Sequence, residues 1–124
     1  MNNKENASKR TIGNHYEHLA ASYLEKLGYQ ILEKNVWYRW GEIDLVVLDQ
    51  LKNELVFVEV RHKAENPMCT PAESISKTKI QRLKRAIDTY LVSLQFEQLK
   101  LNCRGVRIDL MAFDANDRME LINQ

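Results

Sequence analysis

The chain has 124 residues, 44% of them hydrophobic, and its eighteen basic and seventeen acidic side chains give a formal net charge of +1. This length fits one compact domain, and a charge so near neutral excludes a polybasic protein without excluding a local basic patch. No segment approaches the roughly 20 apolar residues of a membrane-spanning helix, so we expect a cytoplasmic protein with no membrane partner. The cysteines, Cys69 and Cys103, lack the spacing of a disulfide framework or a zinc knuckle.

The N-terminal quarter predicts a tail followed by a helix. Residues 1–10 are polar and predict a flexible tail, which leaves residues 11–124 as a single domain. Apolar side chains then recur at helical spacing, and Gly28 ends this stripe as a C′ residue. At about 100° per residue, Glu17 projects close to Leu24, so we expect its carboxylate at the edge of the core. The stripe consists of Tyr16, Leu19, Ala20, Tyr23, Leu24 and Leu27.

Three strands are predicted next. Residues 29–35 fit a first strand, and residues 36–40, with aromatic side chains around Arg39, predict a loop. Residues 42–48 and 55–61 are nearly all apolar apart from their charged members, which is typical of strands covered on both faces. The polar stretch between them suits a turn, so we expect an antiparallel hairpin.

The second half of the chain predicts a loop, a helix and two more strands. Residues 64–76 hold both prolines and predict the loop, and either Thr70 or Ser76 is a candidate N-cap for the following helix. In that helix, apolar residues cover an arc of about 100° and basic residues occupy the remainder. Residues 105–113 alternate as a fourth strand does, and residues 118–122 fit a short edge strand. The predicted fold is α/β, a mixed central sheet flanked by helices in the order helix, three strands, helix, strand.

Each strand of the predicted hairpin has a carboxylate where a hydrophobe is expected. Asp44 lies inside the first apolar run and Glu59 inside the second. An unpaired carboxylate is costly to bury, so each acid needs a cation. The residues leave two interpretations open: ion pairs that only hold the sheet together, such as Glu59 with Arg61 or Asp44 with Arg39, or a shared metal ion.

Strand geometry favours the metal ion if both acids share a face. Residues two apart in a strand lie about 6.6–6.8 Å from each other on one side, which aligns Glu59, Arg61 and Lys63. Asp44 on the neighbouring strand then completes a group of two carboxylates and two cations near a strand end. Mg²⁺ binds a few carboxylate oxygens plus water and uses its open positions for phosphate oxygens. Such a site suits phosphodiester hydrolysis.

The spacing of these residues resembles a nuclease motif. Asp44, then Glu59, then Arg61 two positions later follow the PD-(D/E)xK pattern of the restriction-endonuclease-like superfamily. Over residues 9–113 the chain also resembles the YraN-like family of uncharacterised small bacterial proteins. The motifs of that family correspond here to residues 13–17, 41–45, 57–63, Lys77 and 107–110.

The resemblance implies a restriction-endonuclease-like fold and a metal-dependent nuclease. The family is similar to archaeal Holliday junction resolvases, in which a helix glutamate joins the two sheet carboxylates, and Glu17 takes that position here. The implied ligands of Mg²⁺ or Mn²⁺ are Asp44, Glu59, Glu17 and the Val60 carbonyl. The implied catalytic set is Glu17, Asp44, Glu59, Arg61 and Lys63. DNA, in particular branched DNA, is the implied substrate, RNA is not excluded, and a homodimer follows by analogy.

One position departs from the family pattern. The usual lysine is Arg61 here, and the usual arginine two residues on is Lys63. Arginine stays protonated in proteins, so Arg61 can clamp a phosphate but cannot activate water by accepting its proton. The sequence therefore leaves enzymatic activity open. The alternatives are a catalytically degenerate nuclease fold that binds nucleic acid or protein, and a structural adaptor whose acids are ion-paired.

Further residues are candidates for contact with nucleic acid. The basic face of the second helix and the aromatic residues 37–40 suit phosphates and unpaired bases, although basic arcs are often only solvated and loop aromatics usually pack. Asp109, in the fourth strand, is expected to pair with a strand-end arginine or a backbone group. The candidate contacts are Arg39, Lys77, Lys79, Arg82 and Lys84.

Overall fold

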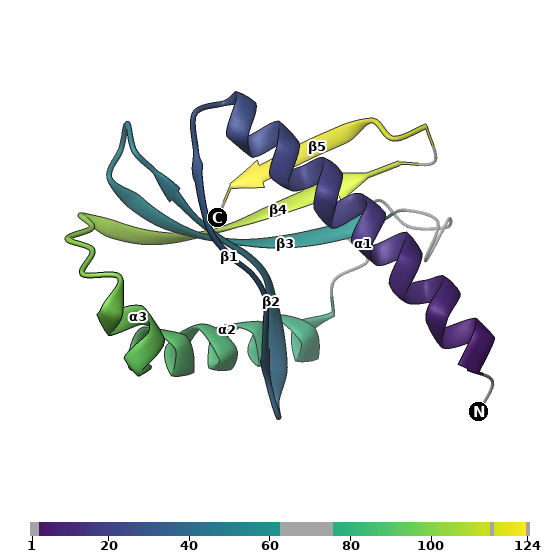
Figure 1. Ribbon diagram of the computed structural model, residues 1–124, viewed down its shortest axis with the longest axis horizontal. Helices are drawn as coiled ribbons and strands as arrows, with labels where there is room; N and C mark the ends of the chain where they lie inside the picture. The colour runs from purple at the N-terminus through teal and green to yellow at the C-terminus, as the bar shows by residue number, and fades with distance from the viewer. Residues whose placement is uncertain (1–2, 63–75, 115, 124) are drawn as a thin grey trace.

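The computed structural model describes residues 3–62, 76–114 and 116–123. Its elements are α1 (Asn3–Lys26), β1 (Gln30–Tyr38), β2 (Gly41–Asp49), β3 (Glu54–His62), α2 (Lys77–Leu91), α3 (Leu94–Gln98), β4 (Gly105–Phe113) and β5 (Met119–Asn123). The five strands form one sheet in the order β1-β2-β3-β4-β5, antiparallel except for the parallel pair β3 and β4. Helices lie on both sides of the sheet (Figure 1). The predicted α/β class, mixed sheet and order of elements are confirmed.

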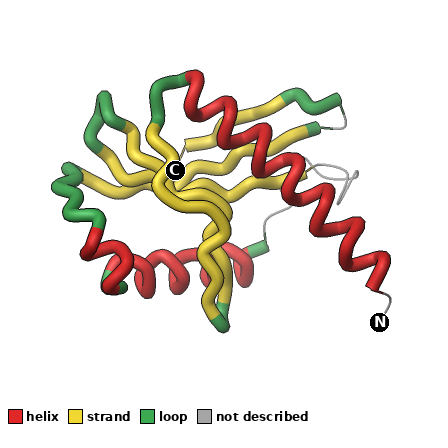
Figure 2. The backbone as a smooth tube through the Cα atoms, viewed as in Figure 1, coloured by secondary structure: helices red, strands yellow, loops and turns green. Residues whose placement is uncertain are grey.

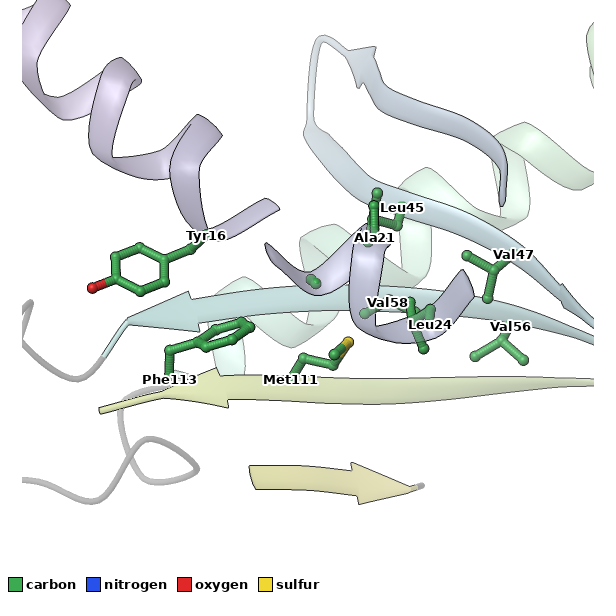
Figure 3. Close-up of a cluster of buried hydrophobic side chains, with 10 residues drawn as sticks. Tyr16, Ala21, Leu24, Leu45, Val47, Val56, Val58, Met111 and Phe113 are labelled. Carbon is green, nitrogen blue, oxygen red and sulfur yellow. The ribbon is translucent and has the colours of Figure 1, made fainter. Parts of the chain in front are cut away.

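Two apolar layers hold the helices to the sheet. Successive side chains of a strand point to opposite faces, so Val56 and Val58 pack toward α1 whereas Leu55 and Phe57 pack toward α2. Figure 3 shows the layer beneath α1. Its buried members are Tyr16, Ala20, Ala21, Leu24, Leu45, Val47, Val56, Val58, Met111 and Phe113. The layer beneath α2 consists of Val36, Ile43, Val46, Leu55, Phe57, Leu83, Ala86, Ile87 and Tyr90.

The first helix starts earlier than the sequence predicts. α1 begins at Asn3, so most of the stretch predicted as a flexible tail, residues 1–10, is helical. Polarity indicated a tail because nothing there can be buried, but Lys, Glu, Ala and Arg are also good helix formers. The predicted end is confirmed, since Gly28 follows the helix with φ of 90°. In the described parts of the chain, no helix is long and apolar enough to span a bilayer.

The first strand is longer than predicted, and the aromatic loop is mostly strand. β1 continues to Tyr38, and only Arg39 and Trp40 connect it to β2. This two-residue connection lacks the Gly, Asn or Asp that usually signals a tight hairpin turn. The tight turn therefore had no local signal, and residues 36–40 were predicted as a longer loop. Ser76 is the N-cap of α2, and its side chain accepts a hydrogen bond from the Lys79 N–H over 3.1 Å. Thr70, the other candidate cap, lies outside the described residues.

The hairpin of β1 and β2 leaves the sheet and passes α2 (Figure 2). The pairing of β2 with β3 starts at Asp49 and Glu54 and ends at Leu45 and Val58, whereas the pairing of β2 with β1 continues to Gly41. Gly41 rests directly on α2, because a Cβ atom there would lie 2.8 Å from the Arg82 carbonyl oxygen. A glycine therefore brings the end of the hairpin into contact with the helix backbone.

Candidate functional site

The candidate site lies where β2 and β3 separate. Past the last paired residues, the Val60 N–H donates to Asp44 Oδ2 over 2.8 Å. A buried backbone N–H needs an acceptor, and here a side chain replaces the neighbouring strand. Asp44 is only 4% exposed, so its carboxylate is part of the sheet's interior.

Glu59 lies next to Asp44 in this gap. The two side chains are hydrogen-bonded to each other, and Glu59 is 5% exposed. Glu59 Oε1 lies 3.3 Å from Lys79 Nζ on α2 and 3.9 Å from Arg61 Nη1 on the same strand. The structure therefore brings together the two acids and the arginine that the sequence singled out. Lys63 lies outside the described residues.

Two further carboxylates surround this pair. Glu42, two residues before Asp44 on β2, shares a hydrogen bond with the Asp44 side chain. Glu17, from α1, is half-buried, and the Asn35 side chain partly opposes the rise in its pKa. Asn35 has φ of 53° and falls opposite Asp44 in the register of β1 and β2. Glu17 thus lies half-buried, in agreement with the core-edge position that helical periodicity predicted, and within range of the charges of Glu42 and Glu59.

Burial and like charge disfavour ionisation of Asp44, Glu42 and Glu17. Burial, followed by the charge of Glu59, raises the pKa of Asp44 well above its usual range, although the Val60 N–H opposes the shift. Burial and the charge of Glu59 also raise the pKa of Glu42. Burial, together with the charges of Glu42 and Glu59, raises the pKa of Glu17. The group therefore favours the addition of positive charge, as protons or as a cation.

The donor set suits a small hard cation. Asp44 and Glu59 supply carboxylate oxygens, and a divalent ion between them would replace the hydrogen-bonded proton. Among the described residues, no three His, Cys, Asp or Glu side chains form a ready ligand group. The fold thus preorganises the pair and leaves Glu17 beside it. A pair is sufficient for Mg²⁺, which is usually bound through one or two carboxylates and keeps several waters.

A cleft of about 1080 Å³ runs from these acids along the end of the hairpin and the first half of α2. Glu42 and Glu59 lie at its acidic edge. Of the residues predicted to contact nucleic acid, Arg39, Lys79 and Arg82 line the cleft. Lys77 and Lys84 are exposed on α2 but do not line it.

Aromatic side chains form the other wall of this cleft. Tyr38 and Trp40 stack with ring centroids 6.1 Å apart, and the Arg85 guanidinium carbon lies 4.5 Å from the Trp40 ring centroid. Trp37 is 71% exposed. It pairs with Glu42, a member of the acidic group, in the register of β1 and β2. The wall thus has an inner Trp covered by arginine and an outer Trp open to solvent.

Sequence reasoning did not include Glu42 or Arg85 among the site residues. The signal for Glu42 was present, because residues two apart in a strand share a face and Glu42 precedes Asp44 by two. Arg85 was assigned to the basic face of the helix, and its stacking on Trp40 depends on where the hairpin ends. That end is set by the contact of Gly41 with α2, which no local pattern encodes.

A second acidic cluster lies at the start of β3 and β4. Arg107 donates to Asp109 over 3.0 Å, to Asp49 over 3.1 Å and to Glu54 over 2.8 Å. It also donates to the Tyr29 hydroxyl over 3.1 Å. The prediction that Asp109 pairs with a strand-end arginine is confirmed, and this cluster is an ion network centred on Arg107.

The fold and this site define a class of protein: an α/β domain with one mixed sheet, in which two buried carboxylates lie together where neighbouring strands separate. The chain belongs to the uncharacterised protein family UPF0102, whose family profile matches residues 16–113. That span contains Glu17, Asp44, Glu59 and Arg61. The predicted membership of the YraN-like family is confirmed.

Similar proteins occur in distant bacteria and are themselves described only as UPF0102 proteins. One from Marinobacter nauticus is 49% identical over 82 residues, 66% of this chain and 65% of the relative. One from Vibrio cholerae is 35% identical over 111 residues, 82% of this chain and 89% of the relative. One from Carboxydothermus hydrogenoformans is 34% identical over 116 residues, 94% of this chain and 92% of the relative.

Proposed function

We propose that the protein is a Mg²⁺- or Mn²⁺-dependent phosphodiesterase that cuts DNA, with branched DNA as the preferred form. The observation that supports this most is the buried pair of Asp44 and Glu59 at the separation of β2 and β3, beside a cleft lined by cations. A buried carboxyl whose pKa is raised by burial and by a neighbouring acid, as that of Asp44 is, is typical of sites that use their electrostatics for chemistry.

In this proposal Asp44 and Glu59 hold the ion, and Glu17 and the Val60 carbonyl complete its surroundings. When bound, the ion lowers the pKa of a water ligand and neutralises charge on the phosphate. The Val60 N–H fixes one oxygen of Asp44 and so orients the other. Arg61, held against Glu59, clamps a phosphate oxygen through its fork of donors.

Lys79 and Lys63 have supporting parts in the same proposal. Lys79 now lies on Glu59, but its side chain is long and partly exposed, so it can exchange the carboxylate for a substrate phosphate. Lys63 follows Arg61 by two positions and supplies the primary amine that the usual motif has at position 61. Neither arginine nor a protonated lysine accepts a proton, so the proton of the attacking water goes to solvent, to the phosphate or to a carboxylate of the site.

The test is cleavage of duplex, single-stranded and junction DNA by the purified chain with Mg²⁺ or Mn²⁺. We expect nicking that Asp44→Asn and Glu59→Gln each reduce to background, because each removes a ligand charge while keeping a similar shape. Asp88→Asn, an exposed acid on α2, is the matched control and should cut normally. Equal cleavage by the wild-type protein and both site variants would contradict the assignment.

A second candidate function is binding without cleavage. It is favoured by the contacts of Glu59, which already lies near both Lys79 and Arg61, and by arginine in place of the motif lysine. The exchange Arg61→Lys with Lys63→Arg discriminates between the two. Cleavage gained only by the exchanged protein identifies a degenerate site, whereas salt-dependent DNA binding without cleavage in both forms identifies a binding module.

A further inference from the structure

The open wall of the cleft carries an exposed indole close to the acids. Trp37 is 71% exposed although it belongs to a strand, and it lines the cleft. Its cross-strand neighbour is Glu42, which lines the same cleft as Glu59. A large aromatic face presented to solvent so near a candidate reaction site calls for a partner with a flat, apolar face of its own.

The cleft wall is held in place, so this indole has a defined position. Gly41 rests on the α2 backbone at Arg82, and Tyr38 stacks on Trp40. Arg85 covers the Trp40 ring from the helix side. These contacts tie the end of the hairpin to α2, and they leave Trp37 as the aromatic face that a ligand can reach.

Positive charge faces the aromatic wall along α2. Arg82 and Arg85 follow Lys79 at helical spacing, and Arg39 extends from the hairpin turn. From Ser76 to Ala86 the helix carries no acidic residue. Among the described residues that line the cleft, the cations therefore lie along its length and the carboxylates, Glu42 and Glu59, lie at one end.

This combination of basic and aromatic side chains favours one kind of polyanion, single-stranded nucleic acid, over duplex nucleic acid and acidic peptides. A positive groove lined by aromatic side chains binds single strands, because each unpaired base offers a face for stacking and the backbone offers phosphates. In a duplex the base faces are stacked on one another, so an exposed indole adds little. An acidic peptide would use the arginines but has no flat base to cover Trp37.

We propose that the cleft binds a single-stranded stretch of nucleic acid, with an unpaired base stacked on Trp37 and its phosphates on Arg39, Arg82 and Arg85. The bound strand leads toward Glu59, so the substrate class is nucleic acid with unpaired nucleotides next to the scissile bond. This deepens the proposed function and rests on it for the role of the acids, but the binding step is measurable without any cleavage.

The experiment measures binding of the full chain to a labelled oligothymidylate and to a blunt duplex, with a chelator present to prevent cleavage. Trp37→Ala should weaken binding of the single strand about 10-fold and leave the duplex nearly unchanged, since one stacked base is lost. Trp37→Phe should retain most of the affinity because it keeps an aromatic face. Leu51→Ala is the matched control, an apolar residue 94% exposed in the turn between β2 and β3.

The charge component is tested in the same assay. Arg39→Ala should weaken single-strand binding and reduce the slope of log K against log salt by about 0.7, the value for one lost phosphate contact on a single strand. Lys52→Ala, a basic residue in the turn between β2 and β3, should leave the slope unchanged. An unchanged slope in Arg39→Ala together with unchanged affinity in Trp37→Ala overturns the proposal.

Two other results also overturn it. If Trp37→Ala weakens the duplex and the single strand equally, the cleft is a duplex-binding surface. If polyglutamate competes as well as oligothymidylate does, the cleft recognises acidic protein. Failure of the nuclease proposal is distinct from both, because it shows as absent cleavage by a protein whose single-strand binding still depends on Trp37. Conversely, normal cleavage with Trp37-independent binding refutes only the stacking site.

Discussion

Two groups of carboxylates lie toward opposite ends of β3, and among the described residues the group at the start of the strand is the one with an arginine at its centre. At the start of the strand, Arg107 donates to three carboxylates and a hydroxyl. Toward its end, Asp44 and Glu59 are hydrogen-bonded to each other, with Lys79 and Arg61 to one side on Glu59. The same residue type thus occurs in two electrostatic settings on one sheet.

The settings shift the ionisation of two acids on β2 in opposite directions. Burial alone would raise the pKa of Asp49, but hydrogen bonds from Arg107 and the Lys52 N–H lower it overall. Burial and Glu59 raise the pKa of Asp44. Burial also raises the pKa of Asp109, with Arg107 opposing the shift. Arg107 therefore keeps the Asp49 carboxylate charged, while the Asp44 end retains a demand for positive charge that a ligand can meet.

The largest expected effect is the removal of the central cation. Arg107→Met removes the cation that Asp49, Glu54 and Asp109 share, and should cost about 3–5 kcal/mol in the free energy of unfolding. Urea denaturation measures this directly. Arg104→Met, the exposed arginine three residues earlier, is the control and should have little effect. Similar losses in both variants would mean that the network is not what stabilises this end.

The next effect concerns a metal ion, which should stabilise the chain only through the Asp44 end. Mn²⁺ at a hundredfold excess over its dissociation constant should raise the free energy of unfolding by about 2.7 kcal/mol relative to chelator. The increment should vanish when Asp44→Asn and Glu59→Gln are combined, and should persist in Asp49→Asn. An increment of equal size in the double variant would place the bound ion elsewhere.

Matched amide substitutions on β2 should have effects of opposite sign. Asp49→Asn weakens charge-assisted hydrogen bonds to Arg107 and should destabilise the chain by about 1 kcal/mol. Asp44→Asn keeps an acceptor for the Val60 N–H but removes a disfavoured charge, so without metal it should stabilise the chain at neutral pH. Both values come from urea denaturation in chelator. Destabilisation by both variants would refute the contrast between the two ends.

The smallest effect is the pH dependence of these differences. The pKa of Asp44 is raised on folding, so its folded state binds more protons, and stability falls as pH rises from about 4 through the folded pKa. The advantage of Asp44→Asn over the wild-type chain should therefore grow with pH. The pKa of Asp49 is lowered, so the penalty of Asp49→Asn should be full above about pH 4 and shrink below it. Denaturation curves at several pH values with chelator test both trends.

The sequence predicted the parts of the site that depend on local pattern. Asp44 and Glu59 were recognisable because each interrupts an apolar strand, and Glu17 because helical periodicity turned it toward the core. The pairing of Asp109 with an arginine was predicted from its place in a strand, and Arg107 is two residues away on the same face.

The parts that the sequence did not reveal depend on how far strands remain paired. An alternating pattern specifies which face a residue occupies but not where a neighbouring strand departs. The separation of β2 from β3 after Leu45 and Val58, the strand conformation of residues 36–38 and the stacking of Arg85 on Trp40 all follow from that departure. α3 was also not predicted, since its five residues are too few for a periodic signal.

The hydrogen bond from the Val60 N–H to Asp44 gives position 44 a diagnostic value among relatives. Aspartate there performs two tasks, closing the end of a hydrogen-bond ladder and carrying a charge. Asparagine can take over the first task alone. Under the proposed function, a family member with an amide at this position would keep the fold but hold the ion poorly, whereas a member that hydrolyses DNA would carry the acid. The residue at this one position would then be a sequence marker of the proposed activity.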